Sequence, residues 1–295
     1  MRLAYDIVDV FTDRPFAGNQ LAVVHGGGDL TTAQCQQIAR EFNFSETTFP
    51  VPQSDDAYAV RIFTPGSEIP FAGHPTLGTA WVLRSQGRLS GESATQHCGA
   101  GEVGVRFSGD RTVELSARPR DSVGHDGRFV ARLLADLGLF PSDLDGPVWV
   151  AGCGLTFAYV PVADDALGRV HVPPRALSEY DDQPDVRDPM DGVDVYSVAR
   201  SGDDLAVHAR VFVPGLSVPE DPATGAAAAG LGIALVETGR LAGGGSYTIR
   251  QGLEMGRPST LHGRVDVDAD GRPVLCHVAG EVQTVARGEI EVPAP

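Results

Sequence analysis

Hydrophobic and polar residues alternate along several short segments of the chain, with the period of two that is typical of half-buried β-strands. The pattern predicts strands at 2–11, 21–24, 47–49, 58–63, 147–151, 156–162, 193–199 and 206–213. Residues 102–118 are predicted to form a hairpin that turns at Gly109 and Asp110. Further strands are expected at 282–286 and 289–292, and this tail could close either half of the molecule.

Helical periodicity is present in four segments. The first helix is predicted at 32–42, capped by Thr31 or Thr32, because apolar residues recur there at helical spacing. The others are expected at 75–86, 129–137 and 224–239, and the one at 129–137 is expected to mirror the one at 32–42. The acidic, proline-containing stretch 180–191 is interpreted as a surface loop.

One sequence pattern occurs twice, about half a chain length apart. Residues 61–66 read RIFTPG and are followed by PFAGH at 70–74; residues 210–215 read RVFVPG and are followed by DPATGA at 221–226. Each copy predicts a strand, a Pro-Gly turn, a glycine-containing loop and a helix of small residues. We therefore expect a duplicated α+β fold.

The duplication predicts two pseudo-symmetric lobes, each a curled and mostly antiparallel sheet around a central helix. The N-terminal lobe is expected to comprise 1–118 and 282–295, and the C-terminal lobe 119–281, with the polar stretch 118–126 as the crossing. Small residues such as Gly78 and Gly230 would let each sheet wrap closely around its helix. We expect the active site in the cleft between the lobes, where the two helix starts would meet.

Composition narrows the range of functions. The chain has 295 residues, 42% of them apolar, which is enough for two globular domains. Its net charge of −16 argues against nucleic acid and anionic membranes as partners, since both require clustered positive charge. All 23 basic residues are arginines, so Schiff-base chemistry with pyridoxal phosphate and a phosphate-loop lysine are both excluded.

The four cysteines are Cys35, Cys98, Cys153 and Cys276, and their spacing matches neither a zinc motif nor a disulfide framework. We expect no metal and no cofactor. The first residues are too polar for a signal peptide and no apolar run is long enough to span a membrane, so a cytoplasmic location is expected.

Candidate chemistry lies in the two glycine loops. Gly73 and Gly225 each precede a helix whose first N–H groups can attract a carboxylate, although a helix start can also bind only water. His74 lies within the first loop. Asp221 precedes the second loop, where it could form a turn with Pro222 or act as an acceptor or proton relay.

Glu46 is a polar residue at the entrance of an apolar strand, between Phe44 and Phe49. A single glutamate is most often an exposed partner in an ion pair. Burial near aromatic rings would instead raise its pKa towards the range that a general acid and base needs.

Several segments resemble the PhzF-like phenazine-biosynthesis isomerase family. They are DVFT at 9–12 with GN at 18–19, FSETTF at 44–49, 70–76, 220–225, QG at 251–252 and MGRP at 255–258. The family shares the fold of diaminopimelate epimerase and needs no cofactor. The resemblance implies that Glu46 is a proton shuttle and that His74 and Asp221 hold and help to protonate the substrate.

The resemblance also implies a carboxylate substrate, held by Asn19, Gly73, Gly225 and Ala226, and a homodimer. The named family reaction converts trans-2,3-dihydro-3-hydroxyanthranilate into a ketone by moving a hydrogen along the ring. Ala226 stands where the family commonly has serine, which leaves open a binding protein that has lost its reaction. A hydrolase or lyase ranks below both, since neither glycine loop supplies a serine or cysteine nucleophile.

The related epimerases use one cysteine in each glycine loop as a paired acid and base. The equivalent positions here are Ala72 and Thr224, so a two-thiol racemase is excluded.

Overall fold

The structure is a computed structural model that describes residues 1–180, 189–201, 204–214 and 219–294. Most of the loop expected at 180–191 lies outside these residues. The chain divides into two compact units, one of Met1–Leu115 with Ala279–Pro295 and one of Ser116–Val278. The chain therefore leaves the first unit before the polar stretch that was expected to form the crossing.

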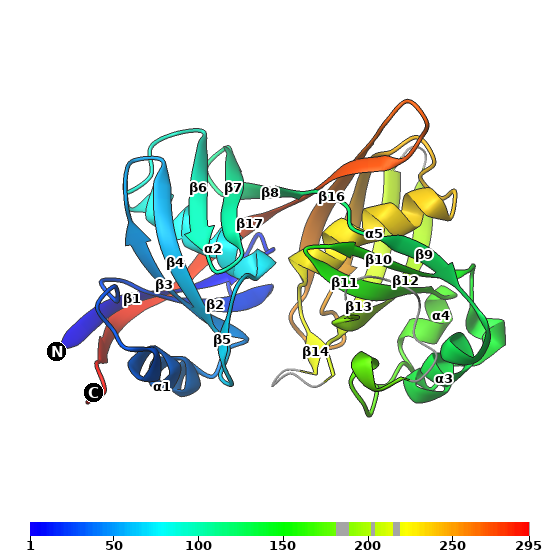
Figure 1. Cartoon of the computed structure of the whole chain (residues 1–295), viewed down its shortest axis with the longest axis horizontal. Helices are drawn as coiled ribbons and strands as arrows, with labels where there is room; N and C mark the ends of the chain where they lie inside the picture. Colours follow the sequence, from blue (N-terminus) through cyan, green and yellow to red (C-terminus); the bar gives the residue numbers. More distant parts are fainter. Residues whose placement is uncertain (181–188, 202–203, 215–218, 295) are drawn as a thin grey trace. The chain divides into compact units, whose positions relative to one another are not determined.

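The first unit contains a mixed sheet, one covering helix and one central helix (Figure 1). Its elements are β1 (Arg2–Val10), β2 (Asn19–Val24), α1 (Thr32–Phe42), β3 (Glu46–Pro52), β4 (Ala57–Phe63), β5 (Glu68–Ile69), α2 (Gly73–Ser85), β6 (Ser93–Cys98), β7 (Gly101–Ser108) and β8 (Thr112–Ala117). Neighbouring strands pair in the antiparallel sense, except that β2–β3 and β4–β6 are parallel. The predicted hairpin is confirmed as β7 and β8.

The second unit repeats this order of pairings. Its elements are β9 (Ser122–His125), α3 (Gly127–Leu137), β10 (Val148–Cys153), β11 (Leu155–Pro161), α4 (Asp164–Leu167), β12 (Gly192–Ser201), β13 (Asp204–Phe212), β14 (Glu220–Asp221), α5 (Gly225–Glu237), β15 (Gly245–Gln251) and β16 (Ser259–Val267). Here β11–β12 and β13–β15 are the parallel pairs, at the same places in the order as β2–β3 and β4–β6. The predicted duplicated α+β fold is confirmed.

The predicted equivalence of the helices at 32–42 and 129–137 is wrong. Helix α1 connects β2 to β3, whereas α3 precedes β10, so the short helix α4 between β11 and β12 occupies the place of α1. The helix predicted at 129–137 is itself confirmed as α3, whose buried residues include Phe129, Leu133 and Leu137. Periodicity locates a helix but carries no information about its place in a repeated topology.

The chain ends in one long strand, β17 (Pro273–Glu291), where two strands were expected. Residues 282–291 pair with β1 throughout its length, so the tail completes the sheet of the first unit. The expected break fell at Gly288, which instead lies in the ladder opposite Tyr5. A Cβ at this position would come within 2.6 Å of the Tyr5 hydroxyl, so glycine here makes room for the ring.

The central helices α2 and α5 each contain 13 residues and are buried along most of their length. A Cβ on Gly78 of α2 would lie 2.6 Å from Leu21 Cδ2 on β2. A Cβ on Gly230 of α5 would collide with the hydroxyl of Tyr159 on β11. These glycines let each sheet approach its helix closely, as the sequence predicted.

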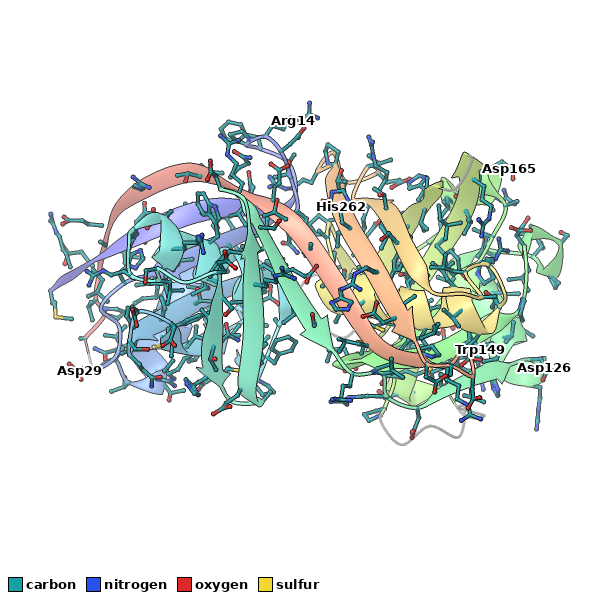
Figure 2. The ribbon with its side chains drawn as sticks, turned by 90° about the horizontal axis from the view of Figure 1, so that it is seen from above. Arg14, Asp29, Asp126, Trp149, Asp165 and His262 are labelled. Atoms are coloured by element: carbon teal, nitrogen blue, oxygen red, sulfur yellow. The ribbon has the colours of Figure 1, made fainter. Side chains whose placement is uncertain are left out.

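Several acidic side chains are exposed, in a chain whose net charge is −16. Asp29, Asp126 and Asp165 are exposed and project from the surface of their units (Figure 2).

Replacing Gly230 with alanine is expected to destabilise the protein by about 1–3 kcal/mol, because the new methyl group must displace the fully buried ring of Tyr159. The higher helix propensity of alanine offsets about 1 kcal/mol at most. Urea denaturation would measure the change. Gly168→Ala is the matched control, since no atom lies within 4 Å of a Cβ there; equal stability of the two variants would contradict the close packing.

Candidate active site

The starts of α2 and α5 lack the side-chain capping that α1 shows. Thr31 and Gln34 form a capping box at the start of α1. In contrast, Ala72 and Thr224, the N-cap residues of α2 and α5, make no side-chain hydrogen bond to the first turn. The N–H groups at both glycine loops are therefore not capped by their N-cap side chains, and such groups can attract an anion.

Glu46 and His74 come together within the first unit. Glu46 is the first residue of β3, and His74 lies in the first turn of α2. His74 Nε2 is 3.4 Å from Glu46 Oε2, and the two side chains are only 5% and 15% exposed. A carboxyl group and an imidazole thus lie close together, and both are mostly buried.

Successive side chains of β3 point to opposite faces of the sheet, which explains the direction in which the Glu46 side chain points. Thr48, two residues further on, lies on the same face and shares a 2.8 Å hydrogen bond with Thr79 of α2. Phe49 lies on the opposite face, where it packs with Ile38 of α1. Glu46 therefore faces the central helix rather than Phe49, and His74 is its neighbour.

His74 is held from its other side by Asn19, the first residue of β2. Asn19 Nδ2 is 3.3 Å from His74 Nδ1, and Ser45 Oγ donates to Asn19 Oδ1 at 3.4 Å. Burial lowers the pKa of His74 to about 3, although a hydrogen bond with the backbone of Gln20 acts in the opposite direction. The imidazole is consequently neutral at physiological pH.

We expect the His74 ring to remain neutral from about pH 8 down to about pH 4. Its ¹³C-labelled ring signals, assigned by comparison with His74→Asn, should then show no titration in NMR spectra over that range. Because the folded-state pKa lies below the ordinary value of 6.5, this group makes the protein less stable as pH falls from 6.5 towards 3. A His74 signal that titrates near pH 6.5 would contradict this assignment.

Asp221, Gly225 and Ala226 come together within the second unit. Asp221 Oδ2 accepts a 2.6 Å hydrogen bond from Thr224 Oγ1. Gln251 Nε2 donates to the Asp221 carbonyl at 2.7 Å and to Thr224 Oγ1 at 3.1 Å. Gly225 and Ala226 form the buried first turn of α5. This loop thus contains a hydroxyl, that of Thr224, although residue 226 is an alanine.

Sequence reasoning missed the residues that brace these loops. Arg61 on β4 makes two bonds of 2.8 and 2.7 Å to Glu68 on β5. Arg210 on β13 makes two bonds of 2.9 and 3.0 Å to Glu220 on β14. The only available signal was the arginine that begins both copies of the repeated pattern. Each pair fixes the short strand that leads into a glycine loop.

Gln251 and Gly252, part of one family-like motif, also have a structural role here. Gly252 has a φ of +72°, and a Cβ there would lie 2.5 Å from the carbonyl oxygen of Arg257 and 2.7 Å from that of Pro222. Glycine is required at this position, and it places Gln251 against Asp221 and Thr224.

Cys35, Cys153 and Cys276 are buried and Cys98 is partly exposed on β6, and none occupies an N-cap position of α2 or α5. Within the part of the chain that the structure describes, no cluster of three or more His, Cys, Asp or Glu side chains could hold a metal ion. Over the same residues, no helix is long and apolar enough to cross a membrane.

The family model for phenazine biosynthesis-like proteins matches residues 8–288. The chain belongs to this family. It is 33% identical to a trans-2,3-dihydro-3-hydroxyanthranilate isomerase of Pseudomonas fluorescens, over 97% of this chain and 98% of that protein. It is 35% identical, with the same coverage, to the enzyme of the same name from Pseudomonas chlororaphis.

A PhzF-family phenazine biosynthesis protein of Bacillus anthracis has the same fold, with a TM-score of 0.85 and 24% identity over 99% of this chain and 100% of that one. Together with the curated relatives, the family match identifies this chain as a PhzF-type isomerase.

Proposed function

We propose that this isomerase moves a proton on a small cyclic carboxylate without a cofactor, using Glu46 as both base and acid. The observation that carries the proposal is the buried pair of Glu46 and His74, whose facing atoms are 3.4 Å apart. The names of its relatives suggest trans-2,3-dihydro-3-hydroxyanthranilate as the substrate.

In the proposed reaction, the Glu46 carboxylate removes a proton from one ring carbon and becomes a carboxylic acid. It then returns that proton to another ring carbon, and the resulting enol rearranges to the ketone. A single carboxyl group suffices, because it removes one proton from the substrate and returns one proton to it.

In this proposal the neutral imidazole of His74, oriented by Asn19, orients the substrate and assists protonation beside Glu46. Asp221 is assigned a second role in holding and protonating the substrate, supported by its ordered contact with Thr224. The helix starts at Gly73 and Gly225 supply N–H groups for the substrate carboxylate. The proposal also includes a homodimer, which a solution mass of about twice the 31.0 kDa chain would support.

Proton NMR in heavy water with trans-2,3-dihydro-3-hydroxyanthranilate tests the function. Formation of the ketone by the purified protein is the expected result, and Asp221→Asn should slow it. A folded protein that binds the compound without reaction or hydrogen exchange would instead support the alternative raised by Ala226, a member of the family that only binds its ligand.

A further inference from the structure

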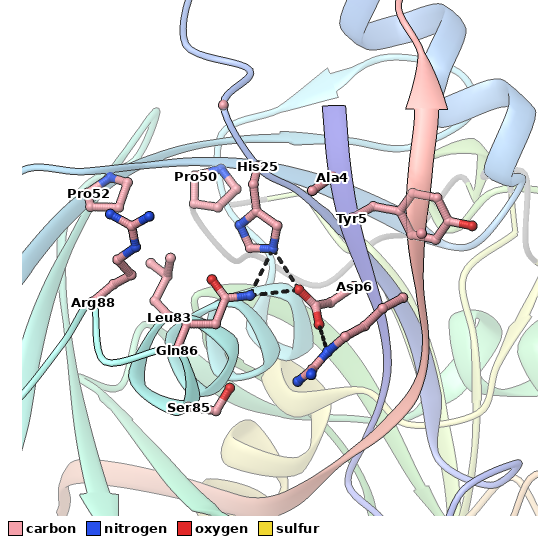
Figure 3. Close-up of a pocket in the computed structure, with 13 residues that line it drawn as sticks. Ala4, Tyr5, Asp6, His25, Pro50, Pro52, Leu83, Ser85, Gln86 and Arg88 are labelled. Carbon is pink, nitrogen blue, oxygen red and sulfur yellow. Dashed lines mark hydrogen bonds and ion pairs between the residues drawn. The ribbon is translucent and has the colours of Figure 1, made fainter. Parts of the chain in front are cut away.

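A cavity of about 780 Å³ opens in the first unit (Figure 3). Neither Glu46 nor His74 lines it. The residues that line it come from the ends of several elements. His25 directly follows β2, Pro50 and Pro52 lie at the end of β3, and Gln86 directly follows α2.

These same three elements begin at the candidate site. Asn19 starts β2, Glu46 starts β3, and His74 lies in the first turn of α2. A helix of this length spans about 18 Å and a strand such as β3 about 20 Å. The cavity is therefore separate from the proposed substrate site, and lies at the far ends of the elements that carry it.

A buried carboxylate organises the cavity. Asp6 on β1 is 4% exposed. Its Oδ1 accepts from Arg287 Nε at 2.8 Å, while its Oδ2 lies 2.7 Å from His25 Nε2 and accepts from Gln86 Nε2 at 2.8 Å (Figure 3). The Asp6 charge is thus already satisfied by protein groups, so that it does not repel an incoming anion as an unpaired carboxylate would.

Two arginines at the cavity have guanidinium groups that are not fully used in contacts with other protein groups. Arg287 uses only Nε to bind Asp6, and its side chain is 66% exposed, which leaves Nη1 and Nη2 for a ligand. Arg88 also lines the cavity, and no ion pair engages it among the described residues. The lining thus has two arginines against one carboxylate, a local excess of positive charge in a chain with a net charge of −16.

The remaining wall is apolar. Pro50, Pro52 and Leu83 line the cavity beside the polar cluster (Figure 3). Guanidinium groups bind carboxylate and phosphate groups with paired hydrogen bonds, and flat apolar surfaces such as proline rings favour a ligand that itself has a ring.

We propose that this cavity is a second ligand site, which binds a small anion with a carboxylate or phosphate group attached to an apolar ring. Arg88 and Arg287 supply the positive charge that attracts the anionic group, Asp6 keeps Arg287 in place, and Pro50 and Pro52 contact the ring.

Benzoate is a suitable probe of this site. Its binding can be monitored by NMR, through the ¹H–¹³C signals of the His25 ring and the ¹H–¹⁵N signals of the Gln86 side-chain amide. We expect saturable shifts of these signals with benzoate, and much weaker shifts with benzyl alcohol, which has the ring but no charge. Arg88→Gln/Arg287→Gln should weaken benzoate binding at least about tenfold, as expected for the loss of charge-assisted hydrogen bonds. Arg106→Gln/Arg111→Gln, which removes the same charge from two other exposed arginines of this unit, should leave binding unchanged.

Absence of shifts at His25 and Gln86, equal binding of benzyl alcohol, or equal affinity of the two double variants would each overturn the proposal. Arg88→Gln alone serves if the double variant is unstable, because Arg88 forms no ion pair with any residue that the structure describes. Repeating the titration with Glu46→Gln separates this site from the proposed function, since binding here should be unaffected by that change.

Discussion

If Glu46 moves the proton as proposed, Glu46→Gln will reduce turnover of trans-2,3-dihydro-3-hydroxyanthranilate by about a hundred- to ten-thousandfold, the range expected when a general acid and base is lost. Glutamine has the shape of glutamate but can neither take up nor release the proton. Because it can still contact His74, substrate affinity should change little. The loss should therefore appear in kcat rather than in KM, and hydrogen exchange into heavy water should fall with it.

Glu41→Gln is the matched control for this experiment. Glu41 is an exposed residue of α1, five positions before Glu46 and outside the candidate site. Its replacement should leave turnover unchanged. Undiminished activity of Glu46→Gln would show that another group moves the proton, whether or not the affinity for the substrate changes.

Asp194→Asn will stabilise the protein at alkaline pH by several kcal/mol. Asp194 on β12 is 1% exposed, and its Oδ1 has no hydrogen-bond partner among the described residues. Burial raises its pKa from the usual 3.8 to about 8, so the folded protein holds a proton that the unfolded chain releases. Each pH unit between these values then costs about 1.4 kcal/mol of stability as pH rises.

Urea denaturation at about pH 5 and about pH 8 measures this effect. The variant has no carboxyl group to titrate, so its advantage over the wild type should grow between the two pH values. Asp110→Asn, at an exposed turn between β7 and β8, should show no such growth. A variant that is less stable than the wild type at about pH 8 would mean that Asp194 is ionised and paired in the folded state.

The repeated pattern carried most of the fold prediction. A Pro-Gly turn, a glycine loop and a run of small residues are local signals, and their recurrence at 61–81 and 210–231 was enough to predict the duplication and both central helices. The proximity of Glu46 and His74 was not a local signal. These residues belong to different elements and meet only because β3 packs on α2 through Thr48 and Thr79.

Other features could not be predicted because they depend on long-range contacts. Asp6 and Arg287 are separated by nearly the whole chain, yet they form one cluster since β1 pairs with β17. The bond between Arg210 and Glu220 spans only ten residues, but it forms through the short pairing of β13 with β14, which the strand pattern did not predict. A polar residue in a strand pattern does not reveal which distant partner satisfies it.

The last strand has a consequence for how the protein is made. The first unit begins with Met1 but needs Ala279–Pro295 to complete it, and β1 pairs with residues of β17 along its full length. On the ribosome, one edge of β1 therefore stays unpaired until residues 282–291 have been synthesised. The second unit, whose residues are contiguous from Ser116 to Val278, can become native first. The amino-terminal unit is thus begun first and completed only after the second unit has been synthesised.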